Sequence, residues 1–89
     1  MIKVELHRSF VKSYRQRIGS NRKLSLQTEK RVIVFRKNRF DSILKDHSLI
    51  GQQKDLRSFS VNGDFRIIYQ LVSEDYAIFI NIGSHNQVY

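Results

Sequence analysis

The sequence predicts an α+β fold in which two N-terminal helices pack on a small antiparallel β-sheet. Three patterns support this class. Apolar residues alternate with charged residues over positions 2–6, recur with helical spacing over positions 10–35, and alternate again over positions 59–82. A chain of 89 residues is long enough to bury a core, and we expect a single domain spanning residues 1–89.

The first strand and the first helix follow from their spacing. Alternation over residues 2–6 predicts a short strand with one buried face. The apolar residues that follow are four apart, which indicates an amphipathic helix: Phe10, Tyr14 and Ile18. Gly19 provides the stop signal because glycine readily adopts left-handed backbone angles.

A second helix begins after Asn21, whose side chain can cap it. Its apolar stripe is Leu24, Thr28, Val32 and Phe35. Residues 32–35 are β-branched or aromatic, so a buried strand is the alternative, but the flanking sequence favours a helix. Residues 38–56 are interpreted as the end of this helix followed by a loop held by apolar side chains; His47 and Lys54 lie there.

Three antiparallel strands should follow, joined by turns at residues 62–64 and 72–75. Placing Val61 opposite Phe65 sets Ser60 across from Arg66, and the second turn then sets Arg66 across from Asn81. The face opposite the core would carry Ser58, Ser60, Asp64, Arg66, Ile68, Phe79 and Asn81. If the chain stays extended past Ile82, Gly83 and His85 continue on that face. We therefore expect Asp64, Arg66 and His85 to converge at one end of the sheet.

Charge is distributed unevenly along the chain. The formal net charge is +8, and 13 of the 16 Lys and Arg residues lie in the first 45 positions. Such a basic chain should attract polyanions, nucleic acid foremost, with an affinity that falls as salt rises. An acidic protein partner or a solvated helix face is the alternative for any single basic residue.

Composition also excludes several classes of protein. The chain has no cysteine, so it has neither disulfides nor thiolate metal sites. No apolar run approaches the roughly 20 residues that span a bilayer, and residues 1–9 do not resemble a secretion signal. We expect a cytoplasmic protein without a membrane partner.

The residues near the C-terminus are suited to cutting RNA without a metal. Attack by the 2′-hydroxyl needs a base, an acid and positive charge at the phosphate. Histidine can serve as base or acid near neutral pH, and the arginine guanidinium matches phosphate oxygens. An exposed aromatic ring, from Tyr89 or Phe65, could stack on a base.

The residues that could take part in such chemistry also have structural interpretations. His7 precedes a helix and is more simply a capping residue, and Asp64 is typical of a turn. Tyr89 could be a loose terminus, and nothing marks Ser60 as a nucleophile. The three histidines lack metal-ligand spacing, so we expect neither a metal site nor a cofactor.

The motifs resemble those of the RelE/YafQ branch of the RelE/ParE toxin superfamily, small basic mRNA interferases from bacterial toxin–antitoxin pairs. The resemblance covers nearly the whole chain and is clearest in RVIVFRKNRF, LKDHSLIG, SFSVNGDFRIIY and NIGSHNQVY. It implies a RelE-like fold, a cognate antitoxin that forms a hetero-oligomer with the toxin, and cleavage of mRNA in the ribosomal A site.

The resemblance also implies roles for individual residues. His85, His47 and Asp64 match the acid–base positions, with His85 the main acid or base, and Arg66 matches the arginine at the scissile phosphate. Tyr89 matches the C-terminal aromatic that stacks on a base. We also expect Lys54, Arg57 and Phe65 to bind RNA. Ser60 stands where YafQ-like proteins have a histidine, so any proton transfer at that position is absent or reassigned.

Two other functions fit the same pattern. A ParE-like inhibitor of DNA gyrase would use the same scaffold but would not need His47 and His85. A non-catalytic module that only binds RNA or its antitoxin is suggested by Ser60 and by the chain ending at Tyr89.

Overall fold

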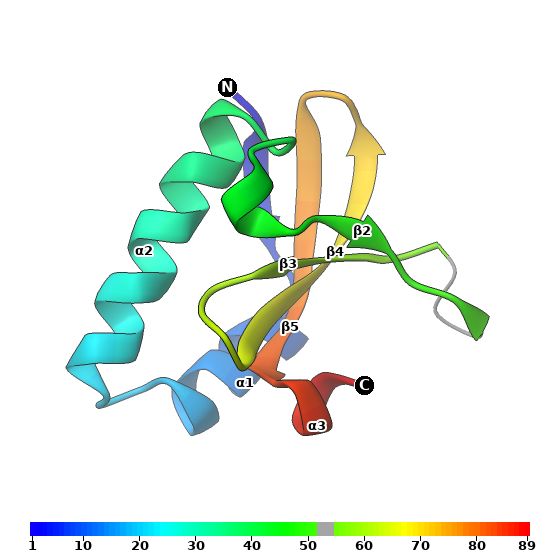
Figure 1. Ribbon diagram of the computed structural model, residues 1–89. Coiled ribbons are helices and arrows are strands. Elements are labelled where there is room, and N and C mark those ends of the chain that lie inside the picture. The colour runs from blue at the N-terminus through cyan, green and yellow to red at the C-terminus, as the bar shows by residue number, and fades with distance from the viewer. Residues whose placement is uncertain (52–54) are drawn as a thin grey trace.

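The computed structural model describes residues 1–51 and 55–89, and its elements confirm the α+β class (Figure 1). Lys54, expected to bind RNA, lies outside the described residues. In chain order the elements are β1 (Lys3–Leu6), α1 (Arg8–Arg17), α2 (Arg22–Lys37), the 3-10 helix η1 (Ser42–Leu44), β2 (His47–Ser48), β3 (Arg57–Ser60), β4 (Phe65–Ser73), β5 (Tyr76–Ser84) and α3 (His85–Val88).

The two long helices begin at side chains that cap them. Nδ1 of His7 accepts a hydrogen bond of 3.1 Å from the backbone N–H of Ser9, so the capping interpretation of this histidine is confirmed. Oδ1 of Asn21 accepts one of 3.1 Å from the N–H of Leu24. Residues 32–35 lie within α2, as the flanking sequence favoured.

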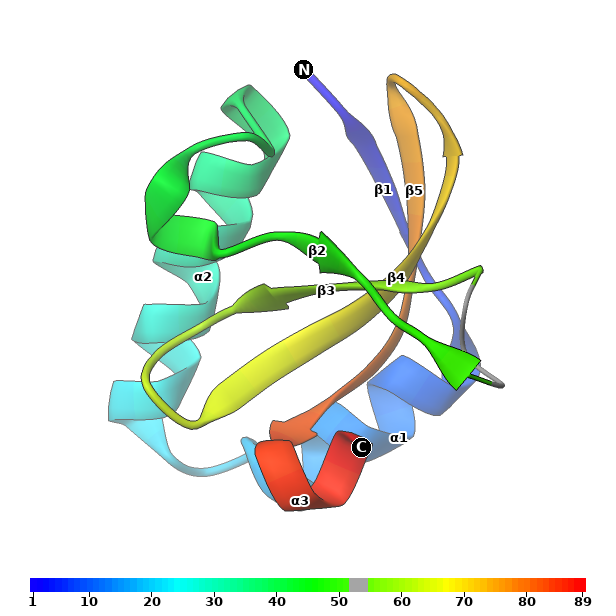
Figure 2. The ribbon, with the colours of Figure 1, turned by 45° about the vertical axis from the view of Figure 1, so that its right-hand side comes forward.

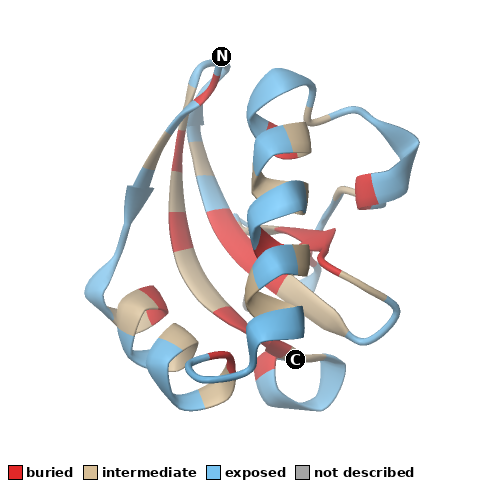
Figure 3. Ribbon diagram, turned by 90° about the vertical axis from the view of Figure 1, so that its left-hand side faces the viewer, coloured by how far each residue is buried: buried red, intermediate tan, exposed pale blue. Residues whose placement is uncertain are grey.

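The sheet is mixed rather than wholly antiparallel. Its strand order is β1-β5-β4-β3-β2, in which β1 runs parallel to β5 and the other neighbours are antiparallel. Helices α1 and α2 connect β1 to the rest of the chain and cover one face of the sheet (Figure 3). We call this covered side the core face and the opposite side the outer face. The segment 38–56, expected to be a loop, contains η1 and the short edge strand β2.

The predicted register is correct between β3 and β4 and wrong between β4 and β5. Ser60 lies opposite Arg66, but Arg66 lies opposite Gly83 rather than Asn81. The turn is shorter than expected, and the pairing shifts between Ile68/Tyr69 and again between Leu71/Ser73. A bulge adds a residue to one strand and reverses the alternation beyond it.

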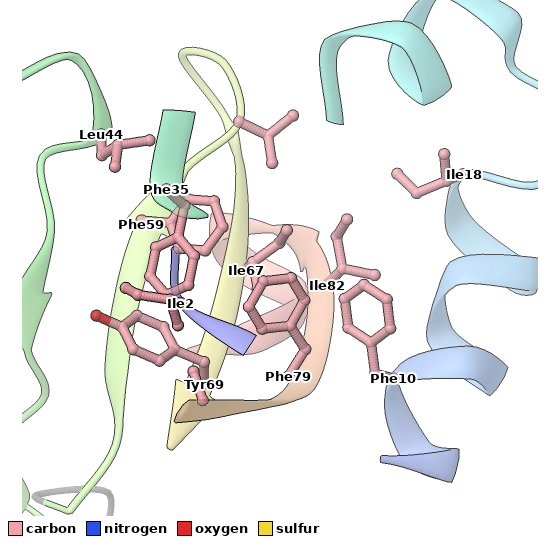
Figure 4. Close-up of a cluster of buried hydrophobic side chains, with 12 residues drawn as sticks. Ile2, Phe10, Ile18, Phe35, Leu44, Phe59, Ile67, Tyr69, Phe79 and Ile82 are labelled. Carbon is pink, nitrogen blue, oxygen red and sulfur yellow. The ribbon is translucent and has the colours of Figure 1, made fainter. Parts of the chain in front are cut away.

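Phe79 lies between the two register shifts, and the altered pairing changes the face of β5 on which its side chain lies. Phe79 was expected on the outer face, yet it is buried on the core face opposite Tyr69. Figure 4 shows its ring among the aromatic side chains from α1, α2, β3 and β4. Phe35 is at the centre of this group, with its ring stacked at 4.6 Å on the ring of Phe59.

A second, smaller cluster lies on the outer face. Leu49, Ile68 and Val88 are buried together, and Leu56 packs against them. Val88 belongs to α3, so this cluster holds the C-terminal turn against the sheet. Figure 2 shows α3 at the C-terminal end of β5 and β2 alongside β3. None of the helices in the described part of the chain is long and apolar enough to cross a membrane.

Candidate functional site

The candidate site lies on the outer face where β4 begins and β5 ends. Two cross-strand rows bring its residues together. Ser60, Arg66 and Gly83 are neighbours across β3, β4 and β5 in the first row. His47, Ser58, Ile68 and Asn81 form the second row, which reaches the edge strand β2. Directly paired residues point to the same face, so these side chains surround one stretch of surface.

Asp64 and His85 meet at one end of this surface. The backbone N–H of His85 donates a hydrogen bond of 3.0 Å to the carbonyl oxygen of Asp64 and lies 3.4 Å from its Oδ1. His85 does not continue β5, as the extended-chain expectation required, but is the first residue of α3. Ser84 and Gln87 form a capping box that turns the chain at this point. The imidazole of His85 is exposed, and so is the Asp64 side chain.

Tyr89 connects this end of the site to β3. Its hydroxyl donates a hydrogen bond of 2.6 Å to Oγ of the buried Ser58. Its ring lies edge-on to the ring of His85, with 4.6 Å between the centroids. The terminal tyrosine is therefore fixed at both ends of its side chain while 46% of its surface stays exposed.

His47 lies beside Ser58 on the edge strand, with its imidazole exposed. Its Nδ1 is 2.9 Å from the carbonyl oxygen of Lys45. A carbonyl only accepts hydrogen bonds, so Nδ1 carries the proton in this arrangement and Nε2 of the neutral ring is the acceptor. His47 thus presents a nitrogen that can take a proton.

Asp46 anchors the strand that carries His47. Its carboxylate accepts a hydrogen bond of 2.8 Å from Nε of Arg57 and another from the hydroxyl of Tyr69, and it lies 3.7 Å from Nη1 of Arg39. Burial, followed by the hydrogen bond to Asp46, raises the pKa of Tyr69 above its usual value, so Tyr69 remains the neutral donor.

The structure places Arg57 and Phe65, both expected to bind RNA, away from the outer face. Arg57 lies opposite Tyr69 in the register and is engaged with Asp46. Phe65 is half-buried against the core cluster. Arg66, by contrast, lies on the outer face, and its Nε is buried with no hydrogen-bond partner among the described residues.

Sequence reasoning did not identify Arg17 and Gln87 as neighbours of this site. Nη1 of Arg17 donates 3.0 Å hydrogen bonds to Oδ1 of Asn81 and to the carbonyl oxygen of Ile82. A Cβ atom on Gly83 would lie 2.8 Å from that Nη1 and 2.8 Å from Oε1 of Gln87. The glycine therefore allows these polar groups to approach the strand. No periodicity links Arg17 to a strand that begins 59 positions later, so the sequence held no signal for this contact.

A large hollow lies away from the candidate site. One of about 440 Å³ is lined by residues from β1, α1 and α2, including Leu6, Phe10 and Val32, and contains none of the candidate site residues. Among the described residues, no three His, Asp or Glu side chains are grouped closely enough to hold a metal ion.

Comparison with known proteins gives a consistent family. Residues 2–89 match the model of a family described as bacterial toxin of type II toxin-antitoxin system, YafQ. No curated protein sequence matches the chain. A copper-bound variant of a Helicobacter pylori toxin is 28% identical, with a TM-score of 0.75 over 100% of both chains.

Escherichia coli YafQ has the same fold at lower identity. It is 21% identical to this chain, with a TM-score of 0.76 over 100% of this chain and 99% of the other. The E. coli DinJ–YafQ complex matches with a TM-score of 0.74 at 21% identity, over 100% of this chain and 99% of that one.

Proposed function

Because the chain belongs to the YafQ family of toxins from bacterial type II toxin–antitoxin systems, we propose that it is a ribosome-dependent endoribonuclease that cleaves mRNA in the A site. The observation that carries this proposal is the gathering of His85, Asp64, Tyr89 and Arg66 on one exposed face, with His47 at its edge. Because its proposed substrate is mRNA on the ribosome, the protein would act in the cytoplasm.

The proposed reaction is attack by the ribose 2′-hydroxyl on the adjacent phosphorus. A base takes the 2′-hydroxyl proton, the new O2′–P bond forms, the P–O5′ bond breaks, and an acid protonates the leaving 5′-oxygen. The products are a 2′,3′-cyclic phosphate and a 5′-hydroxyl. The side chains proposed for these steps need no metal, because proton transfer and charge stabilisation both come from the protein.

His85 is the main acid or base in this proposal. Its backbone is fixed against Asp64 and its ring against Tyr89, so its position is set before RNA arrives. His47 and Asp64 share the other proton transfer or orient the RNA. Nε2 of His47 is the acceptor in the neutral ring, which suits it to act as a base.

Arg66 and Tyr89 supply binding and charge stabilisation. Arg66 lies on the outer face, where the planar fork of its guanidinium would bring positive charge to the scissile phosphate. Tyr89 offers a ring to stack on a base, and its hydrogen bond to Ser58 lowers the entropy lost on ordering.

A cognate antitoxin is proposed as the protein partner, in a hetero-oligomer. The E. coli relative forms a complex with DinJ, and the net charge of +8 favours a partner with acidic surface.

Primer extension on mRNA from a cell-free translation reaction tests the nuclease proposal. Wild-type protein should produce new 5′ ends in translated mRNA. His85→Ala should cut at least about a hundredfold more slowly, because an acid–base group usually contributes at least that much to the rate. His7→Asn is the matched control, because it removes a histidine but keeps a side chain that caps α1. Equal cleavage by wild type and His85→Ala would contradict the assignment.

The same preparations should be assayed with purified DNA gyrase. We expect no inhibition of supercoiling. Inhibition that survives in His85→Ala would instead support the ParE-like alternative.

A further inference from the structure

A basic hollow adjoins Arg66 at the edge of the sheet. It has a volume of about 260 Å³ and lies just before the start of β2, between η1 and the turn that joins β3 to β4. Its lining is Arg31, Ile43, Lys45, Ser60, Asn62, Gly63 and Arg66. Three of these residues are cationic and none is acidic, so the hollow is suited to an anion.

Arg66 is shared by the hollow and the candidate site. Its Nε atom is buried without an acceptor among the described residues, although Ser60 lies directly across the strand pair. Oγ of Ser60 instead donates a hydrogen bond of 2.6 Å to the carbonyl oxygen of Asn62. An unsatisfied buried donor is costly, and an anionic oxygen in the hollow would remove that cost.

Arg31 fixes the opposite wall of the hollow. Its Nη1 donates hydrogen bonds of 3.2 Å to the carbonyl oxygen of Ile43 and 3.0 Å to that of Ser60. These bonds join η1 to β3 and hold the guanidinium charge in place. The hollow is therefore organised without a ligand.

Lys45 adds a third positive charge to the lining of the hollow. It ends η1 with left-handed backbone angles, at a φ of 50°, and its side chain is exposed. The carboxylates nearest in sequence are already engaged: Asp46 binds Arg57 and Tyr69, and Asp41 caps η1 through the N–H of Ile43. Among the described residues, neither carboxylate forms an ion pair with the cationic residues of the hollow.

We propose that this hollow binds the phosphate of an RNA nucleotide next to the scissile one. The proposal rests on the proposed nuclease function, because Arg66 links the hollow to the outer face where cleavage would occur. A phosphate here would accept from Arg66 and be attracted by Arg31 and Lys45. Ser60 makes this possible through its small side chain, since a histidine at that position would extend into the hollow.

Binding of an uncleavable RNA tests the hollow alone. The probe is a fluorescein-labelled 12-nucleotide RNA that carries a 2′-O-methyl group at every position, and its anisotropy is measured over a range of salt concentrations. The test variant is Lys45→Asn, because asparagine tolerates the left-handed backbone. Lys12→Gln is the matched control: it removes the same charge from an exposed position on α1. Lys45→Arg keeps the charge.

Lys45→Asn should raise the dissociation constant about three- to tenfold near 0.1 M salt and reduce the log–log salt slope by about 0.7, the value for one phosphate contact on a single strand. Lys45→Arg should bind within about twofold of wild type, and Lys12→Gln should leave the slope unchanged. Equal effects of Lys45→Asn and Lys12→Gln would overturn the proposal. Urea midpoints matching wild type show that each variant is folded.

The proposal for the hollow and the proposal for the nuclease site can each be refuted without refuting the other. Cleavage by His85→Ala tests the chemistry, whereas binding of the uncleavable RNA tests only the hollow. If His85→Ala abolishes cleavage and Lys45→Asn binds like the Lys12→Gln control, the nuclease assignment stands and the phosphate hollow is wrong.

Discussion

Replacing Asp46 by asparagine should destabilise the fold well beyond the loss of a surface ion pair. The carboxylate is only 5% exposed and faces two guanidinium groups, from Arg57 at 2.8 Å and Arg39 at 3.7 Å. It also accepts a hydrogen bond from the hydroxyl of Tyr69. Asparagine keeps the shape and can still accept one hydrogen bond, but it leaves two positive charges without their counter-ion.

The expected magnitude lies between two known limits. Exposed ion pairs contribute about 0.2–1 kcal/mol, whereas breaking a fully buried pair costs about 3–5 kcal/mol. The side chains of Arg57 and Arg39 are 29% and 16% exposed, so solvent screens part of the cost. We expect a loss of about 2–3 kcal/mol in the free energy of unfolding, which lowers the midpoint temperature by roughly 10–20 °C in a chain of this size.

Urea unfolding followed by far-ultraviolet circular dichroism measures this loss. The matched control is Asp75→Asn, an exposed aspartate in the β4–β5 turn whose carboxylate accepts a hydrogen bond from Ser73, and it should change stability by less than about 0.5 kcal/mol. The difference between the two variants should persist at about 1 M salt, because buried charges are screened little. Equal, small losses for both variants would refute the reasoning. Because Asp46 precedes His47, we also expect Asp46→Asn to slow cleavage.

Three further predictions concern the core, the pH dependence and the site. Phe35→Ala removes a fully buried ring from the aromatic cluster and should cost about 3–5 kcal/mol in urea unfolding; a loss below about 1 kcal/mol would contradict the packing. The raised pKa of Tyr69 stabilises the fold fully below its unfolded pKa, so the wild-type advantage over Tyr69→Phe, about 1–2 kcal/mol near pH 8, should shrink above about pH 10 and would contradict the account if it grew. Gly83→Ala should displace the ends of Arg17 and Gln87, slow cleavage measured by primer extension, and cost less than about 1 kcal/mol because both side chains can move; cleavage at the wild-type rate would contradict the role of this approach.

The two long helices, α1 and α2, could be predicted from sequence because their signals are local. Asn21 and Gly19 mark ends that depend only on neighbouring backbone angles and capping bonds. The parallel pairing of β1 with β5 joins residues more than 70 positions apart, and periodicity carries no information about which strands become neighbours. The mixed sheet could therefore not be predicted from the sequence pattern.

The sequence predicted which residues lie in the site better than it predicted how they are arranged. Asp64 and His85 were expected to meet, and they do, but through the backbone N–H of His85 at the start of a helix. The bulge that moved Phe79 into the core is set by packing of side chains across the sheet, not by any local motif. Arg57 was expected to bind RNA, and the sequence did not reveal that it is engaged with Asp46, 11 positions away along the chain.

Cleavage of an mRNA with one modified nucleotide tests the central claim most directly. The cut site is first mapped by primer extension on translating ribosomes, and the nucleotide on its 5′ side is then replaced by its 2′-deoxy counterpart. Attack by the 2′-hydroxyl predicts that this mRNA is not cut at that position, while the unmodified mRNA yields a fragment ending in a 2′,3′-cyclic phosphate. Cutting of the deoxy-substituted mRNA at the same position and rate would contradict the account.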